Sequence, residues 1–139
     1  MIKIYIIISC VVCGTRKTIC DHKNDLYNDE RVLQIKTQTI DEFQSLCNHC
    51  NLQKRQICIR EKQTKQIYSA KNIQRYKYLP FEFPWEKKFY NKNDIYCKTG
   101  TYWFDPVEFD KNIFRYLTIT NPIITEIKHK IKSNIIKRQ

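Results

Sequence analysis

The chain has 139 residues, a formal net charge of +11, seven cysteines and only two glycines. This length is enough for one domain with a modest core and leaves no room for a second sizeable domain. The longest apolar run, Ile4 to Val12, is far shorter than the roughly 20 residues of a membrane-spanning helix, and no other stretch comes closer.

The N-terminus has the layout of a secretory signal peptide. Lys3 precedes the apolar run, and the small residues Val12 and Gly14 occupy positions −3 and −1 of a cut before Thr15. We therefore predict that residues 1–14 are a cleaved leader and that the protein is secreted.

A buried β-strand is the alternative interpretation of the same apolar run. Cys10-Val-Val-Cys13 would then follow a strand, which is the position of the redox pair in thioredoxin-like enzymes. The scarcity of glycine at turns argues against such an enzyme.

Residues 15–120 are expected to form a single globular domain of the α+β class. Thr39 and Glu42 have the spacing of a capping box before an apolar stripe, which predicts an internal helix near 40–52. The alternation around Thr99-Gly100 predicts a hairpin near 95–104 in a short antiparallel sheet. A last strand is expected over 114–120.

The C-terminal residues 121–139 are predicted to form a basic amphipathic helix. Asn121 and Pro122 suit its start, and isoleucines recur on one face among lysines. This helix is expected to pack on the domain or to extend from it.

Cleavage of the leader would leave five cysteines in an oxidising compartment. We expect two disulfides that stabilise the domain and one odd thiol, which makes a covalent homodimer possible. The sequence does not decide the pairing among these disulfide candidates: Cys20, Cys47, Cys50, Cys58 and Cys97.

A zinc site is the competing use of Cys47-Asn-His-Cys50. Cys58 and Cys97 could supply the other thiolates, with His49 in place of one ligand. The spacing argues against it, because zinc ribbons use two close pairs. No metal or other cofactor is therefore predicted.

The sequence offers no evident catalytic set. His22, His49 and His129 lie in polar or basic surroundings and are expected at the surface, and no nucleophile sits on a strand-to-helix elbow. We therefore predict that the protein is not an enzyme.

The positive charge is concentrated in residues 51–79 and 121–139, which predicts a basic face that attracts polyanions such as glycosaminoglycan, nucleic acid or anionic lipid. Tyr96 and Trp103 are expected as aromatic anchors. The preferred function is a small secreted binding protein of the effector or host-interaction type. The alternative is an intracellular or organellar subunit of a ribonucleoprotein or membrane-bound complex, with reduced or zinc-bound cysteines. The residues assigned to the face are Lys54, Arg55, Arg60, Lys62, Lys128 and Lys132.

Overall fold

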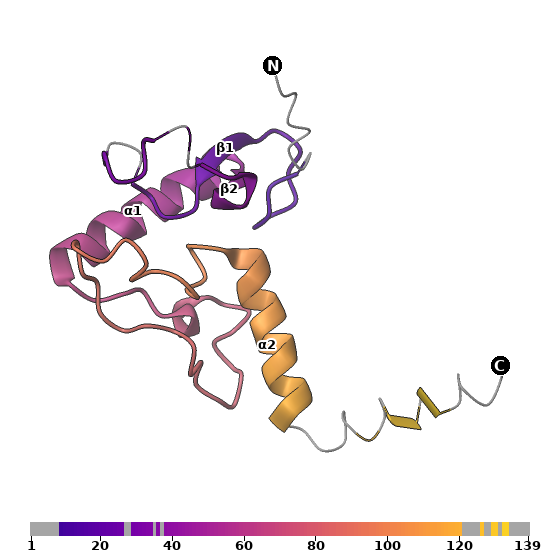
Figure 1. Ribbon diagram of the computed structural model, residues 1–139. Helices are drawn as coiled ribbons and strands as arrows, with labels where there is room; N and C mark the ends of the chain where they lie inside the picture. The colour runs from indigo at the N-terminus through magenta and orange to yellow at the C-terminus, as the bar shows by residue number, and fades with distance from the viewer. Residues whose placement is uncertain are drawn as a thin grey trace. The chain divides into compact units, whose positions relative to one another are not determined.

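The computed structural model describes residues 9–26, 29–34, 36, 38–120, 126, 129, 130, 132 and 133. Up to Thr120 the described residues form a small α+β arrangement with one two-stranded antiparallel sheet and two α-helices (Figure 1). The chain divides into two compact units, Met1–Val107 and Glu108–Gln139. None of the described helices combines the length and apolar character needed to cross a bilayer.

The sheet pairs strand β1 (Ile19–His22) with strand β2 (Phe43–Leu46). Ile19 lies opposite Leu46, and His22 lies opposite Phe43. The last two residues of β1 are polar and yet buried, as is nearly all of β2. Buried polar side chains need partners, so the sheet prepares a polar site rather than a purely apolar core.

The predicted helix near 40–52 is wrong. The capping box of Thr39 and Glu42 exists, but it caps only the 3-10 turn η2 (Ile40–Glu42). The chain becomes extended at Phe43 and enters β2. A capping signal is local, and here the ladder with β1 and the burial of Leu46 outweigh it.

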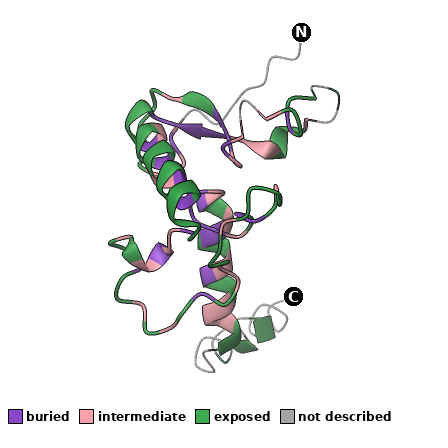
Figure 2. Ribbon diagram, turned by 90° about the vertical axis from the view of Figure 1, so that its left-hand side faces the viewer, coloured by how far each residue is buried: buried purple, intermediate pink, exposed green. Residues whose placement is uncertain are grey.

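Helix α1 (Asn48–Thr64) begins after Cys47, whose sulfur accepts a hydrogen bond from the Cys50 amide. Its buried positions recur at helical spacing, so one face is covered and the other exposed (Figure 2). That covered face is largely polar, and apolar side chains such as Ile59 lie outside. An apolar stripe therefore could not reveal the helix. The buried residues are Cys50, Lys54, Cys58 and Glu61.

The predicted hairpin near 95–104 is also wrong, because these residues form consecutive turns. The amide of Thr99 donates to Tyr96 O and that of Thr101 to Lys98 O, which are local bonds rather than a ladder. Buried Lys98 explains the difference, since its ammonium lies 2.8 Å from Glu61 Oε2 of α1. A strand register would have turned this lysine away from its partner.

The unit Glu108–Gln139 contains most of helix α2 (Pro106–Thr120). The last strand expected over 114–120 is therefore helical. Of the predicted helix at 121–139, the structure describes five residues, all helical, with Lys130 Nζ 2.9 Å from Glu126 Oε1. The rest of that prediction lies outside the described residues.

Candidate metal centre and active site

Four cysteines converge at the start of α1. The sulfurs of Cys10, Cys13, Cys47 and Cys50 all lie within 4.8 Å of one another. The Cys13 and Cys47 sulfurs are 3.6 Å apart, close to the roughly 3.8 Å edge of a tetrahedron with Zn–S bonds of about 2.3 Å. Two Cys-x-x-Cys pairs in this arrangement are a donor set that could hold a structural zinc ion.

Two local turns present these sulfurs. The first is closed by the Gly14 amide, which donates to Cys10 O, and Gly14 adopts a φ of +77°. The Val11 amide donates to Ser45 O, so this turn is fixed to β2. The second pair comes from the cap and first turn of α1. The sheet therefore brings together two short turns that are distant in the sequence.

The four thiols differ in their surroundings. Hydrogen bonds from the hydroxyl and backbone of Thr15 lower the pKa of exposed Cys13 to about 6, with a further contribution from Cys47. Burial raises the pKa of Cys50, and its sulfur neighbours raise it further. A bound dication would instead lower the pKa of Cys50, because a thiol that coordinates a metal loses its proton.

This cluster corrects the prediction of a disulfide-stabilised domain. All seven cysteines belong to the described residues, and each is a free thiol. The distance of 3.6 Å between the Cys13 and Cys47 sulfurs is far longer than an S–S bond of about 2.05 Å. A covalent homodimer is likewise not supported, because all seven cysteines are free thiols and four of them belong to the cluster.

The prediction that residues 1–14 are a cleaved leader stays a prediction, although Cys10 and Cys13 of this segment belong to the cluster. Residues 1–8 lie outside the described residues. Cys10 is buried against Leu46, Cys47 and Cys50, with Val11 and Val12 packed on them. Cys10 is thus part of this core, whereas Gly14, next to the predicted cut, is exposed.

A pocket of about 210 Å³ opens beside β1 and α1, and we call it the His22 pocket. His22 is only 9% exposed and packs edge-on against Phe43, yet neither ring nitrogen has a hydrogen-bond partner. Asn51 Oδ1 is likewise buried without a partner. Unpaired buried polar atoms are costly, and those that line a pocket are available to hydrogen-bond a ligand. The lining residues are Cys20, Asp21, His22, Asn51 and Arg55.

The position of the pocket is fixed by Lys54. Its ammonium lies 2.5 Å from Asp21 Oδ2 and donates to the carbonyl oxygens of His22 and Lys23. Gln44 also donates to Asp21 Oδ2, at 3.0 Å. One lysine of α1 therefore holds the end of β1, so the His22 ring and the Asn51 amide stay side by side.

The donor types suit chemistry on a phosphate ester. An imidazole is the side chain most often used as a general base, and a guanidinium binds phosphate through two parallel N–H donors. Carboxylate and amide oxygens are ligands of Mg²⁺, and Asp21 and Asn51 could provide them. These groups occur together at the junction of one strand and one helix.

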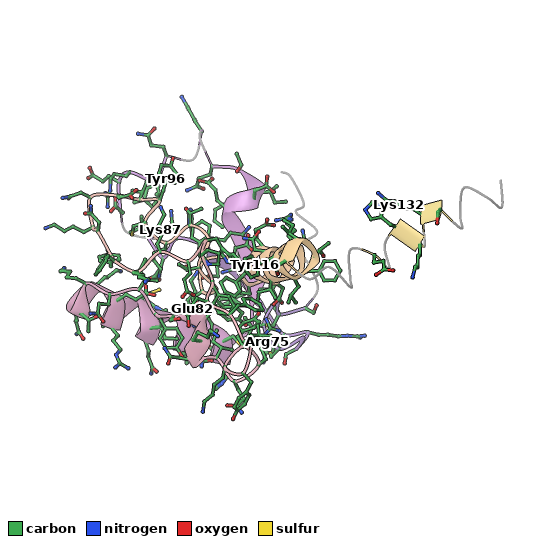
Figure 3. The ribbon with its side chains drawn as sticks, turned by 90° about the horizontal axis from the view of Figure 1, so that it is seen from below. Arg75, Glu82, Lys87, Tyr96, Tyr116 and Lys132 are labelled. Carbon is green, nitrogen blue, oxygen red and sulfur yellow. The ribbon has the colours of Figure 1, made fainter. Side chains whose placement is uncertain are left out.

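The residues predicted for the basic face and the aromatic anchors differ in their surroundings. Lys54 is 0% exposed and Trp103 4% exposed, so neither lies at a surface. Arg55, Arg60 and Lys62 are exposed along α1, and Tyr96 is 67% exposed, near Lys87 in Figure 3. Lys128 lies outside the described residues, and Lys132 belongs to the second unit.

His22, Asp21 and Asn51 were not among the functional residues predicted from the sequence, and His22 was predicted to lie at the surface. The sequence signal for the metal centre was the Cys-x-x-Cys pair that occurs at 10–13 and again at 47–50. Assigning the first pair to a cleaved leader separated it from the second. Together these pairs match the two close pairs of a zinc ribbon. Cys58 and Cys97, the other ligands considered, do not belong to the cluster.

Fold and site define a small α+β protein in which a four-cysteine centre supports a histidine pocket. The sequence profile of the ICEA Protein family matches residues 3–132, and the chain belongs to this family. Over 110 residues it is 38% identical to the type II restriction enzyme NlaIII of Neisseria lactamica, a match that covers 75% of the chain. The chain spans 46% of that enzyme, about half its length. No solved structure matches the chain.

These relationships overturn the functional predictions. A family with a restriction enzyme as a relative contradicts a secreted effector-type binding protein, and it contradicts the prediction that the chain is not an enzyme. Secretion and disulfide bonding are likewise contradicted. Of the polyanions considered as partners, nucleic acid is the one that agrees with this relative.

Proposed function

We propose that this protein is a DNA endonuclease of the restriction type that acts in the cytoplasm. The observation that supports it most directly is the His22 pocket, where an unpartnered imidazole lies beside Asn51 and Arg55. The 38% identity to a type II restriction enzyme supplies the substrate class. A net charge of +11 favours association with a polyanion.

In the proposed reaction, Arg55 binds the phosphate, and His22 takes a proton from the attacking water. The water oxygen forms a bond to phosphorus, the bond from phosphorus to the sugar oxygen breaks, and the released sugar oxygen is protonated from solvent. Oxygens of Asp21 and Asn51 would hold a divalent cation, which neutralises charge on the phosphate when it is bound. Lys54 pairs with Asp21 Oδ2 and donates to the carbonyl oxygen of His22, so its role is to position these two residues.

We further propose that the cysteine cluster holds a structural zinc ion. The cluster lies at the N-terminus of α1 and at the end of β2, so metal binding there would fix the two elements that carry the His22 pocket. A four-sulfur set leaves no open position, and the zinc would serve folding rather than catalysis.

The test is cleavage of a plasmid of several thousand base pairs with added Mg²⁺. His22→Gln should lower the cleavage rate by about 10²- to 10⁴-fold, the usual contribution of a general base. His129→Gln, an exposed histidine of the second unit, is the matched control and should cleave as the parent does. Thermal melting checks that both variants fold.

Two results would contradict the proposal. One is undiminished cleavage by His22→Gln. The other is a folded, zinc-loaded parent that leaves the plasmid intact with Mg²⁺ or Mn²⁺.

A further inference from the structure

A second pocket, of about 480 Å³, lies farther along the same face of α1, and we call it the Tyr90 pocket. It is lined by the segment that follows β1, by Lys62 of α1 and by residues 90–93. Figure 1 shows β1 and the chain after it beside α1, and the contacts of Lys54 and Lys62 with residues 21–25 agree. Both pockets therefore border the same strand-to-helix junction.

The spacing of the pockets suits a nucleic-acid strand. Arg55 of the His22 pocket and Lys62 of the Tyr90 pocket are seven residues apart and share a helix face, roughly 10 Å along the axis. One strand of duplex DNA carries a phosphate about every 3.4 Å of axis. The separation of the two pockets exceeds this repeat, so one strand can pass both of them.

Carboxylates lie next to the cationic side chains of this pocket. The strength of each ion pair decides which cation can bind a phosphate. Arg31 is committed to Asp29, with donors 2.8 and 2.5 Å from its two oxygens, which lowers the pKa of Asp29 to about 2. Lys62 is held less tightly, 3.4 Å from Asp25. Lys92 contributes its carbonyl oxygen to Arg31, and its ammonium has no ion pair among the described residues.

Tyr90 provides a neutral donor among these charges. Its amide donates to Lys65 O at the end of α1, which fixes the backbone. Burial raises the pKa of the Tyr90 hydroxyl, while Lys62, Lys98 and Arg31 oppose that effect. A phenol in such a field keeps its proton and can donate it to a phosphate oxygen.

We propose that the Tyr90 pocket binds the sugar–phosphate backbone of the same DNA strand whose reacting phosphate lies in the His22 pocket. Lys62 and Lys92 neutralise phosphates, and Tyr90 donates a hydrogen bond. Contacts of this kind position the duplex rather than read its bases. The inference rests on the proposed nuclease function and adds a binding subsite to it.

The test measures binding of a fluorescent duplex by anisotropy at several salt concentrations, without added Mg²⁺. Lys62→Met and Lys92→Met should each reduce the slope of log K against log salt by about 0.9, the value for one lost phosphate contact. Lys87→Met is the control, because exposed Lys87 donates to Tyr96 O, which is labelled near it in Figure 3, and does not line the pocket. Its slope should equal that of the parent.

Two further variants make the test specific. Tyr90→Phe should weaken binding about 2- to 10-fold with the salt slope unchanged, as expected for one neutral hydrogen bond. Asp25→Asn should strengthen binding, because it frees Lys62 and asparagine tolerates the φ of 57° at this position. A purely structural carboxylate would give the opposite sign or none.

Unchanged salt slopes for Lys62→Met and Lys92→Met would overturn the subsite. The result is separable from the nuclease proposal, because plasmid cleavage at saturating DNA depends on His22 and not on these lysines. If the parent cleaves the plasmid and both lysine variants keep the parental salt slope, the subsite alone is overturned. If the lysine variants have reduced salt slopes but the parent does not cleave the plasmid, the subsite is supported and the nuclease proposal is overturned.

Discussion

The ammonium of Lys54 lies 2.5 Å from the carboxylate of Asp21, and both side chains are excluded from solvent. Two carbonyl oxygens of residues 22 and 23 complete the surroundings of this ammonium. A buried charge pair of this kind gives little net stability, but its geometry is specific, and loss of one partner leaves an uncompensated charge. The pair joins the strand and the helix whose residues line the His22 pocket.

Removal of this lysine should therefore be costly. Lys54→Met is expected to lower the free energy of unfolding by about 3–5 kcal/mol, because the Asp21 carboxylate loses its counter-charge in the interior. Urea denaturation measures the change. Gln53→Met, at the exposed neighbouring position, should stay within about 0.5 kcal/mol of the parent. Equal effects of the two substitutions would contradict the role of Lys54.

The zinc centre predicts a defined metal content. The purified protein should hold about one zinc per chain, and Cys50→Ser should lose it and melt at a lower temperature, because metal binding is coupled to folding. Cys20→Ser is the matched control for metal content, since Cys20 lies outside the cluster. Elemental analysis and thermal melting provide the readouts. A zinc-free chain, or a mass two hydrogens lighter per bridge, would refute the centre.

The pair of Lys98 and Glu61 offers a second test of buried charge. Burial raises the pKa of the neighbouring Cys58 thiol to about 12, so Cys58 stays neutral near pH 7 and Glu61 is the counter-ion of Lys98. Lys98→Met should cost about 3–5 kcal/mol, and adding Glu61→Leu should recover much of the loss. A double-mutant cycle in urea measures the coupling. Additive effects would show that the pair does not act as a unit.

The two glycines should respond differently to alanine. Both have positive φ, which costs an L-residue about 1–2 kcal/mol. A Cβ at Gly100 would also meet Trp85 O at 3.1 Å, whereas nothing lies within 4 Å of one at Gly14. Gly100→Ala should therefore destabilise the fold more than Gly14→Ala does. Denaturant midpoints of the two variants give the comparison, and the reverse order would be inconsistent with this turn geometry.

The sequence by itself determined the α+β class, the capping box of Thr39 and Glu42, and the positive charge that favours a polyanion, because these depend on local spacing and composition. The sequence also contains both Cys-x-x-Cys pairs. It does not show that they act together, because the apolar run before Cys10 has the same composition in a leader and in a buried strand. Only the tertiary structure decided which residues form the His22 pocket and which lysines are buried. Pairing of β1 with β2 placed His22 beside Asn51, and the polar interior turned Lys54 and Lys98 inward. Hydrophobic periodicity carries no record of such contacts, because their partners are polar and distant in the chain.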